Sequence, residues 1–196
     1  MHAPSRPRRR FAVMAAIIAA HPTVLLAKPA PREMEIHKVP ELGLEIWVEN
    51  QPPWDAKLTN ISGHTTFAAQ SPLTYHPPTV MTYASWPKLL VTPAMLPDVA
   101  TSAIRQASQN FGLDAGRSRS LAIKPATHGN LQGFETDFVG KSDGVAMDVR
   151  IFVGQAPGTF PVALTVYTLQ GKMRHLDESI RRGWGQLKYL SPALKR

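Results

Sequence analysis

The residues of this sequence best suited to chemistry are two aspartates in a predicted β-hairpin. Asp137 and Asp148 lie in the two arms of FETDFVGKSDGVAMDVRIFVG, and residues 141–144 form the predicted turn. With that turn Gly140 pairs with Val145, and the two carboxylates stand opposite each other. Adjacent carboxylates repel unless water, a cation or a shared proton lies between them. They are therefore a candidate metal site or acid–base pair, and the alternative is a solvated sheet face that tolerates both charges.

The other groups that could catalyse a reaction form no recognisable set. None of the histidines after residue 27 are three or four residues apart, the spacing that places two ligands on one helix face; they are His37, His64, His76, His128 and His175. The sequence has no Gly-x-Ser-x-Gly elbow, no phosphate-binding glycine loop and no cysteine. An active site would have to be assembled in three dimensions, for example by His64 approaching Asp137 or Asp148. We expect no cofactor.

A proline-rich segment offers a different kind of site. The stretch SPLTYHPPTVMTYASWP, residues 71–87, carries three aromatic side chains, Tyr75, Tyr83 and Trp86. Aromatic side chains commonly anchor protein interfaces. We therefore expect this segment, together with edge strands, to contact a partner, which would be an envelope or secreted protein.

Hydrophobic periodicity predicts the elements that position these residues. Alternation predicts strands at 44–49, 64–68 and 79–86, and 161–170 is apolar on both faces, as in a central strand. The spacing of apolar residues predicts one helix over 96–112 and a second through Leu176, Ile180, Trp184 and Leu187. In the hairpin one face is apolar, and Glu135 meets Arg150 on the other; the apolar face carries Phe134, Thr136, Phe138, Met147, Val149 and Ile151.

The first 27 residues have the order of an export signal. Four arginines precede an apolar run over 11–20, a proline follows at 22, and cleavage is expected after Ala27. The arginines also permit the twin-arginine route. An uncleaved amphipathic or membrane-anchored start and an organelle transit peptide remain as alternatives. We expect a periplasmic or secreted protein with no stable membrane span after cleavage.

The remaining chain predicts one domain of moderate charge. Removing the four signal arginines from the 22 Lys and Arg leaves 18 against 14 Asp and Glu. Basic residues cluster only at 117–119 and 181–182, so we expect no nucleic-acid partner. The predicted organisation is a flexible lead-in over 28–40, a single α/β domain over 41–190 and a tail over 191–196. The sequence sets no oligomeric state.

The order of these elements resembles the PsbP-like family, whose fold is shared with DcrB-like proteins and a Ran-binding nuclear import factor. The carrying segments are LGLEIWVENQPPW, LPDVATSAIRQASQNFG, LQGFETDFVGKSDGVAMDVRIFVGQAPGTFPVALTVYTLQ and LDESIRRGWGQLKYL, within residues 34–190. The resemblance implies an α+β fold, with an antiparallel sheet in an α/β/α sandwich, used as a binding or assembly module without a catalytic set.

Two functional hypotheses follow. The first is an exported, non-enzymatic module that recognises a protein or a small ligand. The second is a small hydrolase or metal-dependent enzyme. Histidines and carboxylates that converge in one pocket would favour the enzyme, and scattered ones would favour binding.

Overall fold

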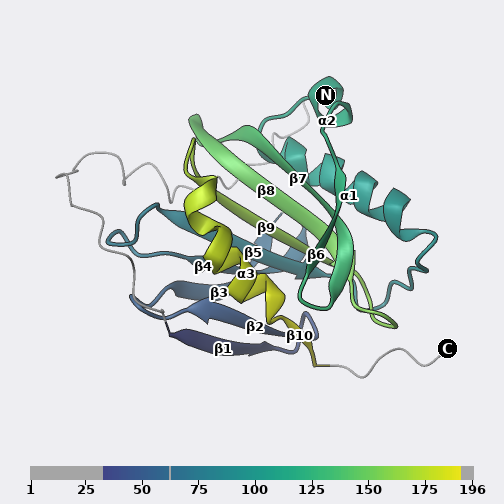
Figure 1. The fold of residues 1–196 in the computed structure, drawn as a ribbon, viewed down its shortest axis with the longest axis horizontal. Helices are drawn as coiled ribbons and strands as arrows, with labels where there is room; N and C mark the ends of the chain where they lie inside the picture. The colour runs from purple at the N-terminus through teal and green to yellow at the C-terminus, as the bar shows by residue number, and fades with distance from the viewer. Residues whose placement is uncertain (1–32, 62, 191–196) are drawn as a thin grey trace, which may run out of the picture.

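A seven-stranded antiparallel sheet forms the centre of the protein in the computed structural model, which describes residues 33–61 and 63–190 (Figure 1). Its strands, in order across the sheet, are β3 (Asp55–Ile61), β4 (His64–Gln70), β5 (Thr79–Ser85), β9 (Val162–Leu169), β8 (Val145–Gln155), β7 (Leu131–Ser142) and β6 (Lys124–His128). The predicted central strand is β9, which has neighbours on both sides and alternates fully and partly buried residues.

A second, smaller sheet contains β1 (Met34–Val39), β2 (Leu44–Glu49) and β10 (Lys188–Tyr189) in the order β1-β2-β10. The prediction of a flexible lead-in through residue 40 is therefore wrong for β1. This strand has no clear alternation of apolar residues, and its Ile36 is exposed. The strand forms because its backbone pairs with β2, and the local sequence does not reveal that pairing. The predicted signal at 1–27, the first part of the lead-in and the tail at 191–196 lie outside the described residues.

Helices cover both faces of the large sheet, so the predicted α+β class is confirmed. On one face α1 (Leu96–Gln109) packs over β7 and β8, with the short α2 (Ala115–Arg119) beside it. Pro97 lies in the first turn of α1, and Gly112 follows its end with a φ of 76°. On the other face lie the 3-10 turn η2 (Met173–Leu176), α3 (Asp177–Gly185) and the small sheet. The core between these layers includes Leu44, Ile46, Tyr83, Phe152 and Trp184.

The long hairpin of β7 and β8 closes more tightly than the sequence analysis predicted. Its turn consists of two residues, Asp143 and Gly144, with φ values of 50° and 83°, and Ser142 pairs with Val145. Asp-Gly suits such a turn, because both central residues need a positive φ. The predicted register is thus wrong by two residues. A shift of two keeps each side chain on its face, so the apolar face still packs against α1, but every cross-strand pair changes.

Candidate functional site

The large sheet has one face that its helix covers only in part. Since α1 packs mainly over β7 and β8, the same face of β3, β4 and β5 stays largely open within the described residues. The strand pairing brings the small side chains of Ala68, Thr82 and Thr165 next to one another on this face, from three adjacent strands. Small side chains on neighbouring strands leave a hollow above the backbone.

We call this hollow the Tyr167 groove. It is a cavity of about 200 Å³ bounded by the open sheet face, the C-terminal end of α1 and the tip of the β7–β8 hairpin. Its floor is formed by Ala68, Thr82 and Thr165, and its apolar walls include Val80, Ala107, Phe111 and Tyr167. Its polar rim carries Asp55, Lys57, Gln70, Asn110, Ser142 and Asp143.

Aromatic packing fixes the wall at the helix end of the groove. The rings of Phe111 and Tyr167 meet edge to face with centroids 5.2 Å apart, and Phe138 packs against Phe111 at 6.1 Å. The Lys141 N–H donates to the Phe111 carbonyl at 2.8 Å and ties the hairpin to the end of α1. Burial, together with the charge of Asp143, raises the pKa of Tyr167 to about 12. The phenol therefore stays protonated at neutral pH and can donate a hydrogen bond.

The rim of the groove is polar but carries little net charge. Lys57 and Asp55 form an exposed ion pair on β3 at 2.7 Å, and Asp143 adds one negative charge at the hairpin tip. An apolar hollow with a few polar groups at its edge is the usual character of a small-molecule site. The cavity is smaller than the roughly 300–1,000 Å³ of drug-sized pockets, so it suits a small ligand or the apolar part of a larger one.

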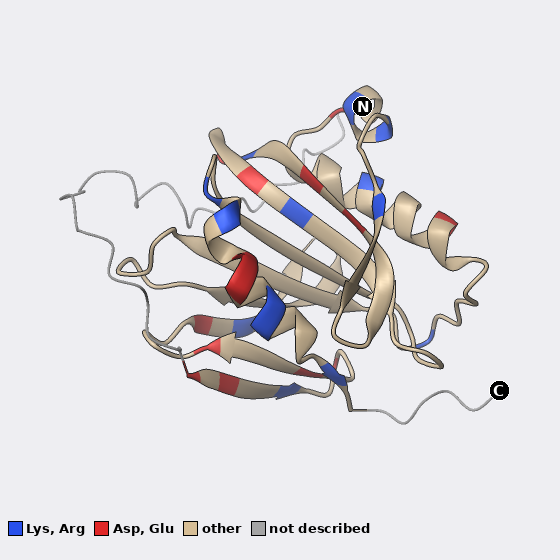
Figure 2. Cartoon of the chain, in the orientation of Figure 1, with Lys and Arg blue, Asp and Glu red and all other residues tan. Residues whose placement is uncertain are grey.

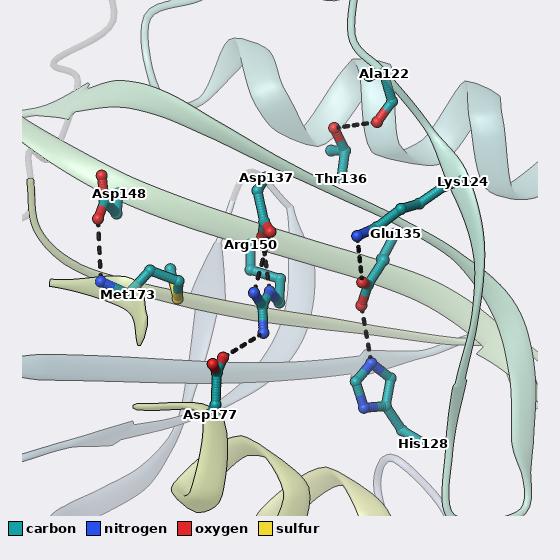
Figure 3. Close-up of polar contacts among 10 residues, drawn as sticks. All are labelled: Ala122, Lys124, His128, Glu135, Thr136, Asp137, Asp148, Arg150, Met173 and Asp177. Atoms are coloured by element: carbon teal, nitrogen blue, oxygen red, sulfur yellow. Dashed lines mark hydrogen bonds and ion pairs between the residues drawn. The ribbon is translucent and has the colours of Figure 1, made fainter. Parts of the chain in front are cut away.

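The predicted carboxylate pair is not formed, because Arg150 stands opposite Asp137 (Figure 3). Its guanidinium donates to both carboxylate oxygens of Asp137, at 2.7 and 3.0 Å, and to Asp177 of α3 at 3.1 Å. Asp148 lies opposite Val139, and its carboxylate accepts the Met173 N–H at 3.0 Å. The predicted cross-strand pairing of the two aspartates is therefore wrong. Their role as a metal site or acid–base pair stays a prediction.

The same network shows why Arg150 is a structural cation. Burial alone would lower the pKa of Arg150, but its hydrogen bonds to Asp137 and the charge of that carboxylate raise the pKa above its ordinary value. Within residues 33–61 and 63–190, no three His, Asp or Glu side chains gather closely enough to hold a metal ion. The predicted cross-strand pairing of Glu135 with Arg150 is wrong, because Glu135 stands opposite Phe152 and Arg150 stands opposite Asp137. The charges of Glu135 and Arg150 still attract each other across the sheet face.

One histidine does meet a carboxylate. His128 on β6 lies 3.1 Å from Glu135 on β7, and Lys124 lies 3.4 Å from the other oxygen of that carboxylate (Figure 3). The hydrogen bond from His128 lowers the pKa of Glu135, against the effect of its burial. The His128 ring packs edge-on against Phe152 at 4.8 Å and Trp184 at 5.0 Å. This pair lies at the margin of the core. No local sequence pattern predicted it, because the two partners are seven residues apart across a turn.

Beyond the His128–Glu135 pair and the His37–Glu35 contact, the described histidines do not gather with carboxylates at one site. His64 lies on the sheet face that carries α1, whereas Asp137 and Asp148 lie on the opposite face. His37 packs against Phe67 at 5.2 Å in the small-sheet layer, near Glu35.

Two of the three predicted partner-binding aromatics lie in the core. Tyr83 is completely buried on the inner face of β5. Tyr75 is buried against Trp54, and its hydroxyl forms a 3.1 Å hydrogen bond with Ser179 of α3. Neither side chain can anchor a partner, so the interface prediction is wrong for both, because each fills the space between the two layers. Trp86 is partly exposed, and its role in binding stays a prediction.

Solved structures share this fold at low sequence identity. A protein from Bacteroides thetaiotaomicron is 7% identical with a TM-score of 0.50; the match covers 78% of this chain and 47% of that one, so this chain spans about half its length. LpqN, involved in cell envelope biogenesis of Mycobacterium tuberculosis, is 13% identical with a TM-score of 0.44, and the match covers 82% and 86% of the two chains. Cyanobacterial PsbP from Synechocystis is 8% identical with a TM-score of 0.47, and the match covers 86% and 99%.

These likenesses concern the fold alone. The weak resemblance to PsbP-like proteins expected from the sequence is found again among the similar structures. No family model matches the chain, and no curated protein sequence matches it. None of the helices in the described residues combines the length and apolar character needed to cross a bilayer.

Proposed function

We propose that this chain is an exported, non-catalytic binding module that holds the apolar part of a small ligand in the Tyr167 groove. The observation that carries the proposal is the composition of the groove, with a floor of small side chains, aromatic walls and a polar rim. Filling such a hollow removes apolar surface from water, and rim groups such as Asn110 and Ser142 can orient the polar end of the ligand.

The scattered histidines and carboxylates support binding over catalysis. Export is supported by the order of charged and apolar residues over 1–27. We expect N-terminal sequencing of the exported protein to begin at or near Lys28. A protein partner in the envelope, as the sequence analysis expected, would have to use Trp86 without Tyr75 or Tyr83.

A groove-filling variant tests the proposal with an apolar fluorescent probe, anilinonaphthalene sulfonate. Thr82 lies in the middle of the floor, so Thr82→Phe places a ring in the groove without entering the core. We expect probe affinity to fall at least about tenfold, the equivalent of about 1.4 kcal/mol. Thr127→Phe, at an exposed position on the far edge strand β6, is the matched control and should bind as the wild type does.

Circular dichroism and urea unfolding must show that both variants stay folded. If the folded Thr82→Phe protein binds the probe as tightly as the wild type, the groove is not the binding site. If the wild type hydrolyses ester substrates and Thr82→Phe does so equally well, the result supports the enzyme hypothesis, with an active site outside the groove.

A further inference from the structure

The loop between β5 and α1 carries an unusual share of the exposed apolar surface. Among the described residues eight large apolar side chains are exposed, and three of them lie in this one loop. They are Leu89, Leu90 and Met95, with exposed fractions of 41%, 68% and 50%. Trp86 at the start of the loop is partly exposed. We call residues 86–95 the Leu90 loop.

The backbone of the Leu90 loop is held in place by hydrogen bonds within the protein. The Trp86 N–H donates to the Pro161 carbonyl at 3.1 Å, the Leu89 N–H to the Trp86 carbonyl at 2.9 Å and the Met95 N–H to the Thr92 carbonyl at 3.0 Å. The buried Gln155 side chain donates to the Val91 carbonyl at 2.8 Å. These bonds fix the backbone at Trp86, Leu89, Val91 and Met95, so the exposed leucine side chains lie on an ordered loop.

The end of the molecule that carries this loop is almost free of charge. The β8–β9 turn, residues 156–160, adjoins the Leu90 loop and shares a hollow with Leu90, Val91 and Pro93. Across residues 86–97 and 156–160 the one charged residue is Lys88. One acid adjoins the loop, because Asp98 in the first turn of α1 lines a shallow hollow with Trp86 and Leu89. Figure 2 shows this end of the molecule, on the right, as mostly tan.

We propose that the Leu90 loop docks on an anionic bilayer surface, with its leucines in the acyl-chain boundary and Lys88 among the headgroups. Aliphatic side chains at the tip, a tryptophan at the margin and a lysine within the loop are the composition that the membrane interface favours. The positive charge of Lys88 favours an anionic surface. A protein interface would instead favour aromatic and arginine anchors within a polar rim. This docking is independent of what fills the Tyr167 groove.

Vesicle flotation tests the proposal. The exported protein is recovered from cells, and its N-terminus is verified as identical in all variants. The wild type should float with vesicles of phosphatidylethanolamine and phosphatidylglycerol. Leu90→Glu should lower binding at least about tenfold, because it places a charge in the apolar boundary. Leu73→Glu, at a position that is 66% exposed at the opposite end of β5, is the matched control and should bind as the wild type does. Lys88→Gln should lower binding about fivefold on these vesicles and leave binding to phosphatidylcholine unchanged.

Fluorescence quenching by brominated lipid adds a readout of position. Trp86→Phe should abolish the quenching, and Trp47→Phe, in the small sheet, should leave it in place. A wild type that does not float overturns the proposal, as does a folded Leu90→Glu protein that floats like the wild type. Self-association that Leu90→Glu abolishes, without vesicle binding, would assign the loop to a second copy. Crosslinking of the loop to an envelope protein, again without vesicle binding, would assign it to a protein partner.

Discussion

The pairing of Arg150 with Asp137 can be measured by a double-mutant cycle. The two side chains form two hydrogen bonds, at 2.7 and 3.0 Å, between adjacent strands, and their exposed fractions are 17% and 44%. Opposite charges 4 Å apart attract by about 1 kcal/mol in water and about 4 kcal/mol at an effective dielectric constant near 20. Exposed ion pairs yield only about 0.2–1 kcal/mol, because solvent screens them and side-chain entropy is lost. A bidentate pair with a mostly buried arginine should lie just above that range, at about 1–2 kcal/mol.

Urea unfolding of the wild type, Arg150→Met, Asp137→Asn and the double variant measures this coupling energy. A second cycle with Asp177→Asn should yield about 0.5 kcal/mol, because Asp177 makes a single bond and is more exposed. The control cycle uses Asp148→Asn, whose carboxylate accepts the Met173 N–H and no arginine proton. Coupling with Asp148 should be close to zero. A coupling below about 0.3 kcal/mol for Asp137, or one larger for Asp148 than for Asp137, would refute the hairpin register and the reasoning built on it.

Three further predictions concern stability. Because the pKa of Tyr167 is about 12 in the folded protein against about 10 ordinarily, its contribution to the free energy of unfolding is complete below pH 10 and is lost as the pH rises toward 12. Urea unfolding between pH 10 and pH 12 should show this loss of stability. Tyr167→Phe should reduce the slope of the free energy of unfolding against pH by up to about 1.4 kcal/mol per pH unit. Gly154→Ala should destabilise the protein by about 1–3 kcal/mol in thermal unfolding, because its Cβ would overlap the Phe152 ring; an unchanged melting temperature would contradict the packing described. Ser179→Ala removes a 2.6 Å hydrogen bond to the buried Glu49 carboxylate and should cost about 1–3 kcal/mol, and a loss below about 0.5 kcal/mol would count against it.

Local periodicity predicted the main elements of this fold. The apolar stripe over 96–112 became α1, and the apolar positions of the closing helix, from Leu176 to Leu187, are all buried. The strand at 161–170, apolar on both faces, lies in the middle of the sheet. These features depend on residues within one turn or one strand of each other, so neighbouring residues carry the information.

The register of the β7–β8 hairpin could not be predicted from local periodicity. Alternation has a period of two, so it assigns each side chain to a face but does not distinguish registers that differ by two residues. The two-residue turn at Asp143 and Gly144 sets the register of the hairpin and places Asp137 opposite Arg150. The preference of Asp-Gly for two-residue turns was a usable signal.

The sequence by itself determined the two long helices, α1 and α3, and the faces of the hairpin strands, because each follows from short-range periodicity. The order of the predicted elements, through the resemblance to PsbP-like proteins, indicated the class of the fold. Only the tertiary structure decided that Tyr75 and Tyr83 are buried, that β1 pairs with β2, and that three small side chains from β4, β5 and β9 meet to form a groove. Each of these outcomes depends on strand order and layer packing. The contacts join residues up to about a hundred positions apart, and no local pattern specifies them.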